Sequence, residues 1–189
     1  MTLESGTEPA AEPGTDTGTD RLILRRWRES DADFMFDLYS RWEVKRFIGR
    51  VPRVMADRAE AATRIAWLPL QDHPVQGLWA VALRDTGELV GNILLKPIPA
   101  SGTDEPLLPS GDIEIGWHFH PDHWGNGYAT EAAGEVLRRA SLAGLHRVVA
   151  VTAPQNVASQ AVCRRIGLMH AGQTTKYYNA TCELFVGTP

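Results

Sequence analysis

Two glycines separated by one residue stand between a strand-like segment and a helix-like segment, and this junction constrains the fold more than any other feature of the sequence. Residues 113–119 alternate apolar and polar side chains, whereas residues 129–144 place apolar side chains at helical spacing. The N–H groups that open such a helix lack partners and carry partial positive charge. Gly125 and Gly127 let that backbone approach a phosphate closely. The junction predicts either a pyrophosphate-binding turn or a tight connection that binds nothing.

Two better-known phosphate motifs do not fit this junction. A dinucleotide-binding fingerprint needs a third glycine three places after the second, where this chain has Thr130. A P-loop needs Gly-Lys followed by Ser or Thr, and the junction lacks it.

Charge is distributed unevenly along the chain. Residues 1–20 hold five of the 23 acidic residues and none of the 19 Lys and Arg residues, and their composition predicts a disordered tail. Residues 21–189 are close to neutral, so they lack the basic footprint of a nucleic-acid-binding protein. Their length suits a single domain.

Membrane and secretory classes are not expected for this sequence. No apolar run reaches the ~18 residues that a membrane span needs, and the first residues do not resemble a signal peptide. Cys163 and Cys182 are too few for a disulfide scaffold and have no metal-binding spacing. We therefore expect a reduced, cytoplasmic protein without a membrane partner.

Apolar periodicity and turn residues predict a mixed α/β (α+β) fold. The clearest element is a hairpin in which two apolar runs flank Asp85-Thr86-Gly87, where Gly87 supplies a positive φ. The order fits neither a regularly alternating doubly wound sheet nor an all-β barrel. The predicted strands are 21–27, the two arms of the hairpin at 77–98, 113–119, 146–153 and one or two within 174–187. The predicted helices are 30–40, 56–68, 129–144 and 156–167.

Residues 121–132, PDHWGNGYATEA, closely resemble the coenzyme A signature of the GNAT superfamily of N-acetyltransferases, and especially its ribosomal-protein N-terminal (Rim-like) branch. Trp124 stands where the general pattern has Gln or Arg, and this branch often has Trp there. The resemblance covers roughly residues 21–168, and further blocks agree in the right order at 19–39, 88–95, 111–132 and 154–168.

The resemblance implies a fold and a cosubstrate. The fold is a central mixed, mostly antiparallel twisted sheet with helices on both faces, split by a V-shaped cleft between the strand ending near Phe119 and the strand at 146–153. The cosubstrate is acetyl-coenzyme A, no metal is needed, and a homodimer is the expected assembly.

The resemblance also assigns the cofactor contacts of the glycine junction. The main chain around Trp117, His118 and Phe119 would pair with the pantetheine arm, and one N–H there would face the thioester oxygen. The pyrophosphate would lie against Trp124, Gly125, Asn126, Gly127, Tyr128, Ala129 and Thr130.

A second wall of the cofactor site is expected in the helix at 156–167. Asn156 and Ser159 match the Asn-x-x-Ser block of the branch, and Asn156 would bond the pantetheine or cap the helix. Arg164 and Arg165 would reach the adenosine 3′-phosphate or coat a solvated helix face.

Glu114 is the candidate general base. Strand geometry places it on one face with Gly116, His118 and His120, opposite the apolar set Ile113, Ile115, Trp117 and Phe119. A glutamate in water has a pKa of ~4.3, so burial or a water chain would have to help it deprotonate an amine. An exposed or salt-bridged structural Glu114 is the alternative, and His118 is a second catalytic candidate.

The general acid is harder to assign. Many members of the superfamily carry a Tyr where this chain has Cys163, and the apolar surroundings of Cys163 predict a small buried side chain. Ser159 would then protonate or hydrogen-bond the departing sulfur. Tyr177 and Tyr178 are substitutes if the last strands fold over the cleft.

His118, His120 and His123 also suggest a metal site, but Pro121 turns the chain between them and cofactor contacts are expected there. We expect the acceptor to be a protein N-terminus or a small amine, and we expect residues 40–75 and 97–112 to line the acceptor side of the cleft. The alternative to an enzyme is a non-catalytic coenzyme A-binding or protein-interaction module of the same fold.

Overall fold

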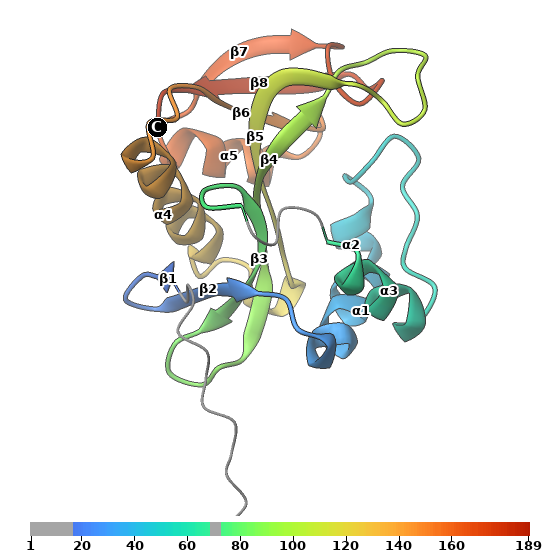
Figure 1. Ribbon diagram of the computed structural model, residues 1–189, viewed down its shortest axis with the longest axis vertical. Coiled ribbons are helices and arrows are strands. Elements are labelled where there is room, and N and C mark those ends of the chain that lie inside the picture. Colours follow the sequence, from blue (N-terminus) through green and yellow to red (C-terminus); the bar gives the residue numbers. More distant parts are fainter. Residues whose placement is uncertain (1–16, 69–72) are drawn as a thin grey trace, which may run out of the picture.

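One eight-stranded sheet organises the structure, a computed structural model that describes residues 17–68 and 73–189 (Figure 1). The strands follow the order β1-β2-β3-β4-β5-β6-β8-β7, and all neighbours are antiparallel except β5 and β6. The predicted mixed, mostly antiparallel sheet is therefore confirmed. The strands are β1 Thr17–Gly18, β2 Leu22–Arg26, β3 Gly77–Leu83, β4 Leu89–Pro99, β5 Pro109–Phe119, β6 Val148–Thr152, β7 Met169–Thr174 and β8 Cys182–Gly187. The helices are α1 Ala32–Ser40, α2 Trp42–Lys45, α3 Arg58–Ala66, α4 Tyr128–Leu142 and α5 Val157–Arg165, with short 3-10 turns η1 Glu29–Asp31 and η2 Pro121–His123.

The β3–β4 hairpin forms because its turn has glycine where a positive φ is required. Gly87 has φ +73°, and its N–H donates to the carbonyl of Leu83 at 2.9 Å. Beyond the turn, β4 continues to Pro99 and pairs with β5. The connection between β4 and β5 is consequently limited to residues 100–108, shorter than the loop expected at 99–112.

Helices cover both faces of the sheet, and each face has its own apolar core. Figure 1 shows α4 and α5 on one side of the strands and α1–α3 on the other. On the first side, Val136 and Ala140 of α4 pack with Leu24 and Ile93 of the sheet. On the second side, the buried residues of α1 and α3 pack against Trp27 and Ala80. The two cores hold the sheet rigidly between them.

The sheet opens between β5 and β6. These parallel strands share one register pair, Glu114 with Val149, while β5 pairs with β4 along most of its length and β6 pairs with β8. From Gly116 to Phe119, β5 therefore has a strand partner on one edge and a gap on the other. This gap is the split that the family resemblance implied.

The ends of the chain differ from the expected boundaries. Residues 1–16 of the predicted tail lie outside the described residues, but Thr17–Gly18 already pair with Ile23 and Leu24, so the ordered chain begins before Arg21. Near the C-terminus, residues 175–181 connect β7 and β8, and β7 begins earlier than predicted. No helix in the described part of the chain is long and apolar enough to cross a membrane.

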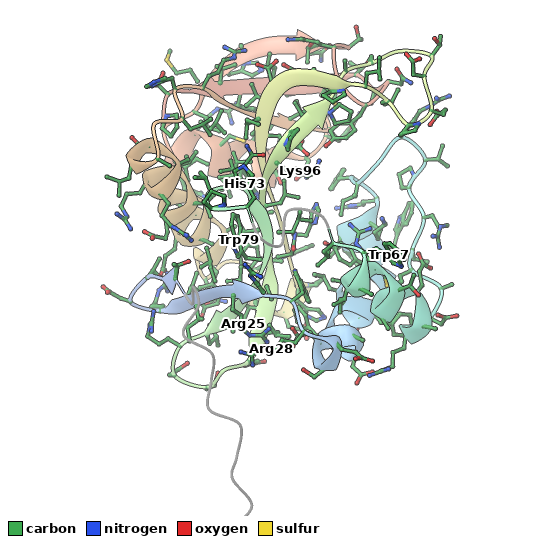
Figure 2. The ribbon with its side chains drawn as sticks, in the orientation of Figure 1. Arg25, Arg28, Trp67, His73, Trp79 and Lys96 are labelled. Atoms are coloured by element: carbon green, nitrogen blue, oxygen red, sulfur yellow. The ribbon has the colours of Figure 1, made fainter. Side chains whose placement is uncertain are left out.

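A buried ion pair fixes the junction between β2 and the first helix. The carboxylate of Asp31 accepts bonds from Arg25 Nη1 at 2.7 Å and Nη2 at 2.9 Å, and from the N–H of Arg28 at 2.8 Å. Figure 2 places Arg25 and Arg28 at this junction. A second ion pair joins Asp33 to Arg58 at 2.6 Å, and the side chain of Asp33 is about three-quarters exposed to solvent.

The two ion pairs are expected to differ in their contribution to stability. Asp31→Ala leaves a buried guanidinium without its partner, so it should lower the free energy of unfolding by about 3–5 kcal/mol. Asp33→Ala removes a solvated pair and should cost less than about 1 kcal/mol. Urea unfolding of both variants measures the difference, and equal losses would contradict the anchoring role of Asp31.

Candidate active site

A cleft of about 1480 Å³ follows the split between β5 and β6. Its walls come from several separate parts of the chain, which the fold brings together. They are Arg21, residues 43–52, Arg64 of α3, Leu94 and Lys96 of β4, β5 from Glu114 to Phe119, the segment from His123 to Glu131, the segment from Ala150 through α5, and residues 178–182. The sequence-predicted residues Glu114, His118 and Ser159 all line it.

The glycine turn meets the requirements of an anion site. Gly125 and Gly127 have φ +82° and +80°, and α4 begins directly after them without a side-chain cap. Among the described residues, no partner accepts a hydrogen bond from the N–H groups of Tyr128, Ala129 or Thr130. These donors lie at the positive end of a fifteen-residue helix.

Side chains around the turn hold its shape. Asn126 does not line the cleft with its side chain; its Nδ2 donates to the carbonyls of His123 at 3.1 Å and Trp124 at 3.3 Å. The indole N–H of Trp124 donates to the carbonyl of Phe119 at 2.8 Å. Arg21 lines the cleft, and its Nε donates to Glu131 at 2.7 Å. Sequence reasoning missed Arg21, whose position depends on β2 lying beside α4.

The β6–α5 wall carries an unsatisfied polar group. Thr152 lines the cleft, and its buried Oγ1 has no hydrogen-bond partner in the structure. Asn156 caps α5 by accepting the N–H of Ser159 at 3.2 Å. The hydroxyl of Ser159 has no partner in the described part of the chain. Buried hydroxyls normally have partners, so Thr152 fits a ligand that brings amide or carbonyl groups into the split.

Glu114 is nearly fully buried and does not stand alone. Its Oε1 forms an ion pair with Nζ of Lys96 at 2.5 Å and accepts a hydrogen bond from the hydroxyl of Tyr178. Lys96 also donates to that hydroxyl at 2.9 Å. Lys96 stands directly opposite Glu114 in the β4–β5 register, so strand pairing was the signal that sequence reasoning overlooked. Figure 2 labels Lys96 on β4.

Tyr178 reaches the cleft from the loop between β7 and β8. Tyr178 and Asn179 have φ +58° and +52°, a conformation that costs non-glycine residues energy and that tends to persist at functional sites. Burial and the negative charge of Glu114 raise the pKa of Tyr178, which keeps its hydroxyl protonated. Tyr177, the neighbouring candidate, points elsewhere and donates to Asp112 at 2.6 Å.

His118 is poorly suited to act as a base. Its Nδ1 lies 3.0 Å from the hydroxyl of Tyr39, and burial followed by the charges of Arg64, Lys45 and Lys96 lowers its pKa to about 3. With Tyr39 as donor to Nδ1, the proton of the ring sits on Nε2, which has no described protein partner and borders the cleft. A ring with so low a pKa accepts a proton poorly at neutral pH.

Other candidates lie outside the cleft. Cys163 is fully buried and absent from the cleft wall, and burial raises its pKa to about 12, as suits a small core side chain. Arg164 stacks on Phe185 with 5.4 Å between guanidinium carbon and ring centre, and it does not line the cleft. Of the two arginines considered for the adenosine 3′-phosphate, Arg165 lines the cleft and Arg164 does not, because consecutive residues of a helix point about 100° apart.

The three histidines of the metal hypothesis belong to separate contacts. His120 Nε2 lies 3.1 Å from Asp37, and His123 Nε2 lies 3.3 Å from Glu88. His118 pairs with Tyr39. Within residues 17–68 and 73–189, no group of three or more His, Cys, Asp or Glu side chains is arranged to hold a metal ion.

Comparison with known proteins agrees with this geometry. Residues 21–169 match the family model described as an acetyltransferase (GNAT) domain. The chain belongs to the GNAT acetyltransferase family. It is 32% identical over 161 residues to the uncharacterized N-acetyltransferase YoaA of Bacillus subtilis, covering 84% of this chain and 85% of that protein.

Solved structures share the fold at low sequence identity. An acetyltransferase from Agrobacterium tumefaciens superposes with a TM-score of 0.72 at 23% identity, over 97% of this chain and 100% of that one. A ribosomal-protein alpha-N-acetyltransferase, RimL, solved in complex with coenzyme A, has a TM-score of 0.71 at 15% identity, over 92% and 97%. This GNAT acetyltransferase therefore shares the fold of these two acetyltransferases, and the RimL structure contains coenzyme A.

Gly127 is expected to be essential for coenzyme A binding. Gly127→Ala forces alanine into a left-handed conformation and places a methyl group beside the Arg21 guanidinium at the turn, so coenzyme A affinity should fall about tenfold or more. Gly144→Ala is the matched control, because Gly144 has φ +78°, lies at the far end of α4 and has no neighbour within 4 Å. Calorimetric titration with coenzyme A compares them, and equal affinities would remove the turn from the binding site.

Proposed function

We propose that this acetyltransferase uses acetyl-coenzyme A to acetylate a primary amine, at a protein N-terminus or on a small molecule, by direct attack in a ternary complex. The observation that supports the proposal best is that the buried carboxylate of Glu114 and the anion-binding turn after Gly127 border the same cleft. One group serves proton transfer and the other serves a polyphosphate cosubstrate.

The chain offers a continuous set of donors for the cosubstrate. The free N–H groups of Tyr128–Thr130 would hold the pyrophosphate, with the charge of Arg21 beside them. The open edge of β5 and the unsatisfied hydroxyl of Thr152 would hold the amide-bearing arm. Acetyl-coenzyme A supplies an acetyl group activated as a thioester.

Glu114 accepts the amine proton in this mechanism. Both described partners of Glu114, Lys96 and Tyr178, contact Oε1, whereas Oε2 has no partner and is not among the fully buried unsatisfied atoms. Oε2 is therefore the atom that faces the cleft and can take a proton from an incoming amine. As the new C–N bond forms and the C–S bond breaks, that proton moves from nitrogen to Glu114.

Tyr178 is the better placed of two proton donors for the departing sulfur. Its hydroxyl is protonated and lines the same cleft as Glu114, so it can give its proton to the thiolate, and the proton that Glu114 took from the amine restores the phenolate once the protonated carboxyl group turns towards it. Ser159 also lines the cleft, but no described base contacts its hydroxyl. Cys163 in place of the usual Tyr therefore does not by itself favour a non-catalytic module, because Tyr178 brings a phenol from another loop.

Replacing the base should abolish turnover while leaving the cosubstrate site intact. Glu114→Gln should lower kcat about 100-fold or more, because the amide cannot take the amine proton, with little change in coenzyme A affinity. The matched control is Asp112→Asn on the same strand, whose carboxylate bonds Tyr177 and Lys176 outside the cleft. Thiol release with an amine panel and mass detection of the acetylated product measures both variants. Full activity of Glu114→Gln would reject the base assignment.

The acid assignment is tested by two neighbouring tyrosines. Tyr178→Phe should reduce kcat about tenfold to 100-fold, because proton transfer contributes at this order or more, whereas Ser159→Ala should have a smaller effect. Tyr177→Phe loses a hydrogen bond to Asp112 outside the cleft and should retain activity. A greater loss in Ser159→Ala than in Tyr178→Phe would transfer the role to Ser159.

A further inference from the structure

The wall of the cleft opposite the glycine turn is rich in cations. Arg46, Arg50 and Arg64 line it, from the chain after α2 and from α3, and Glu43 is the one carboxylate among the described lining residues of that segment. Lys96 and Glu114 also line the cleft but neutralise each other through their ion pair. The wall thus carries an excess of positive charge.

These cations differ from other arginines in the same part of the chain. Arg41 pairs with Asp37 at 2.8 Å, Arg53 with Glu60 at 2.6 Å and Arg58 with Asp33 at 2.6 Å. In the described ranges, by contrast, no carboxylate lies within ion-pair distance of the three cleft arginines. In this part of the chain, the three arginines outside the cleft are paired with carboxylates and the three that line it are not; Arg21, at the glycine turn, lines the cleft but is paired with Glu131.

Aromatic rings hold two of the unpaired cations in place without cancelling their charge. The Arg64 guanidinium carbon lies 5.2 Å from the ring centre of Tyr39, and that of Arg46 lies 4.6 Å from the ring centre of Phe47. The amine of Lys45 lies 5.7 Å from the centre of the same Tyr39 ring.

The positive charge of this wall also affects the pKa values of Lys45 and His118. Burial and then the charges of Arg64 and Arg53 lower the pKa of Lys45, with Glu60 opposing them. Burial, and after it the charges of Arg64, Lys45 and Lys96, lower the pKa of His118, the residue that borders the cleft beside Tyr39. An anion bound here would relieve this mutual repulsion.

We propose that the acceptor amine carries a carboxylate or phosphate group, which binds at Arg64 beside Tyr39 and His118 while the amine reaches Glu114. The inference rests on the proposed function, whose acceptor it specifies. Glu114 and His118 are four residues apart on β5, about 13 Å at ~3.3 Å per residue. The anionic group therefore lies within about four peptide residues of the amine. An acidic N-terminal peptide and a small anionic amine both supply this chemistry.

The experiment compares matched acceptors on the full chain saturated with coenzyme A. Calorimetry measures the binding of the peptide amides Ser-Glu-Glu-Ala and Ser-Gln-Gln-Ala, and of phosphoethanolamine and ethanolamine; acetylation of the four is followed in parallel with acetyl-coenzyme A. We expect the anionic member of at least one pair to bind about tenfold more tightly. The pair that shows the preference identifies the source of the anion. No preference in either pair, or preference for the neutral members, overturns the proposal.

Arg64 variants then locate the anion. Arg64→Gln should remove the preference without changing coenzyme A affinity, and Arg64→Lys should restore part of it. Arg58→Gln is the control, because Arg58 is on the same helix, is paired with Asp33 and does not line the cleft. If Arg64→Gln weakens coenzyme A instead, the cation serves the cosubstrate and the proposal is wrong.

The outcomes also separate this inference from the proposed function. Tight, Arg64-dependent binding of an anionic amine without acetylation would reject the transferase mechanism and retain the anion site. Acetylation without charge preference would retain the mechanism and reject the anion site.

Discussion

Parallel pairing between β5 and β6 ends at Glu114 and Val149, and the rest of the site depends on where it ends. Parallel neighbours cannot be joined by a hairpin, so the chain must cross over, and here it crosses over through α4. The crossover leaves from the end of β5, which places the N-terminus of α4 at the open end of the split. The freed edge of β5 also keeps backbone groups that need partners. One topological event thus creates both the anion-binding turn and the open strand edge.

The cluster of Glu114, Lys96 and Tyr178, where β5 and β6 pair, costs free energy of folding. Glu114 and Lys96 are both withdrawn from water, and such pairs often contribute little net stability. Tyr178 adds backbone strain, since it holds a positive φ next to Asn179, which does the same. Stability alone gives no reason to keep a carboxylate, an amine and a phenol in contact at this position. Their shared access to the cleft gives a chemical reason, because Glu114 can accept the proton of the amine and the neighbouring hydroxyl of Tyr178 can supply one to the departing sulfur.

Local patterns predicted most of the fold and part of the site. Strand alternation around Glu114 correctly placed Ile115 and Phe119 in the core, although both also border the cleft, and the hairpin at Gly87 was recognised from its turn chemistry. What sequence reasoning missed required contacts between distant elements. Lys96 matters because of a strand register, and Thr152 because a neighbouring strand diverges. The sequence also could not choose between Arg164 and Arg165, because a single helical position decides whether a side chain faces the cleft or Phe185.

Local charge in the cleft opposes the charge of the whole chain. The protein carries a net charge of -4, yet the start of α4, where Arg21 is paired with Glu131, is positive at one end of the cleft and Arg64 is positive at the other. Exposed charges are screened over about 10 Å at ordinary ionic strength, whereas charges within a cleft of low dielectric act more strongly on a bound group. Between the two ends, Lys96 cancels the charge of Glu114 without occupying its second oxygen. An anionic acceptor consequently meets no net repulsion from the base that must deprotonate it. The same ion pair therefore reconciles a carboxylate base with two anionic substrates in one cleft.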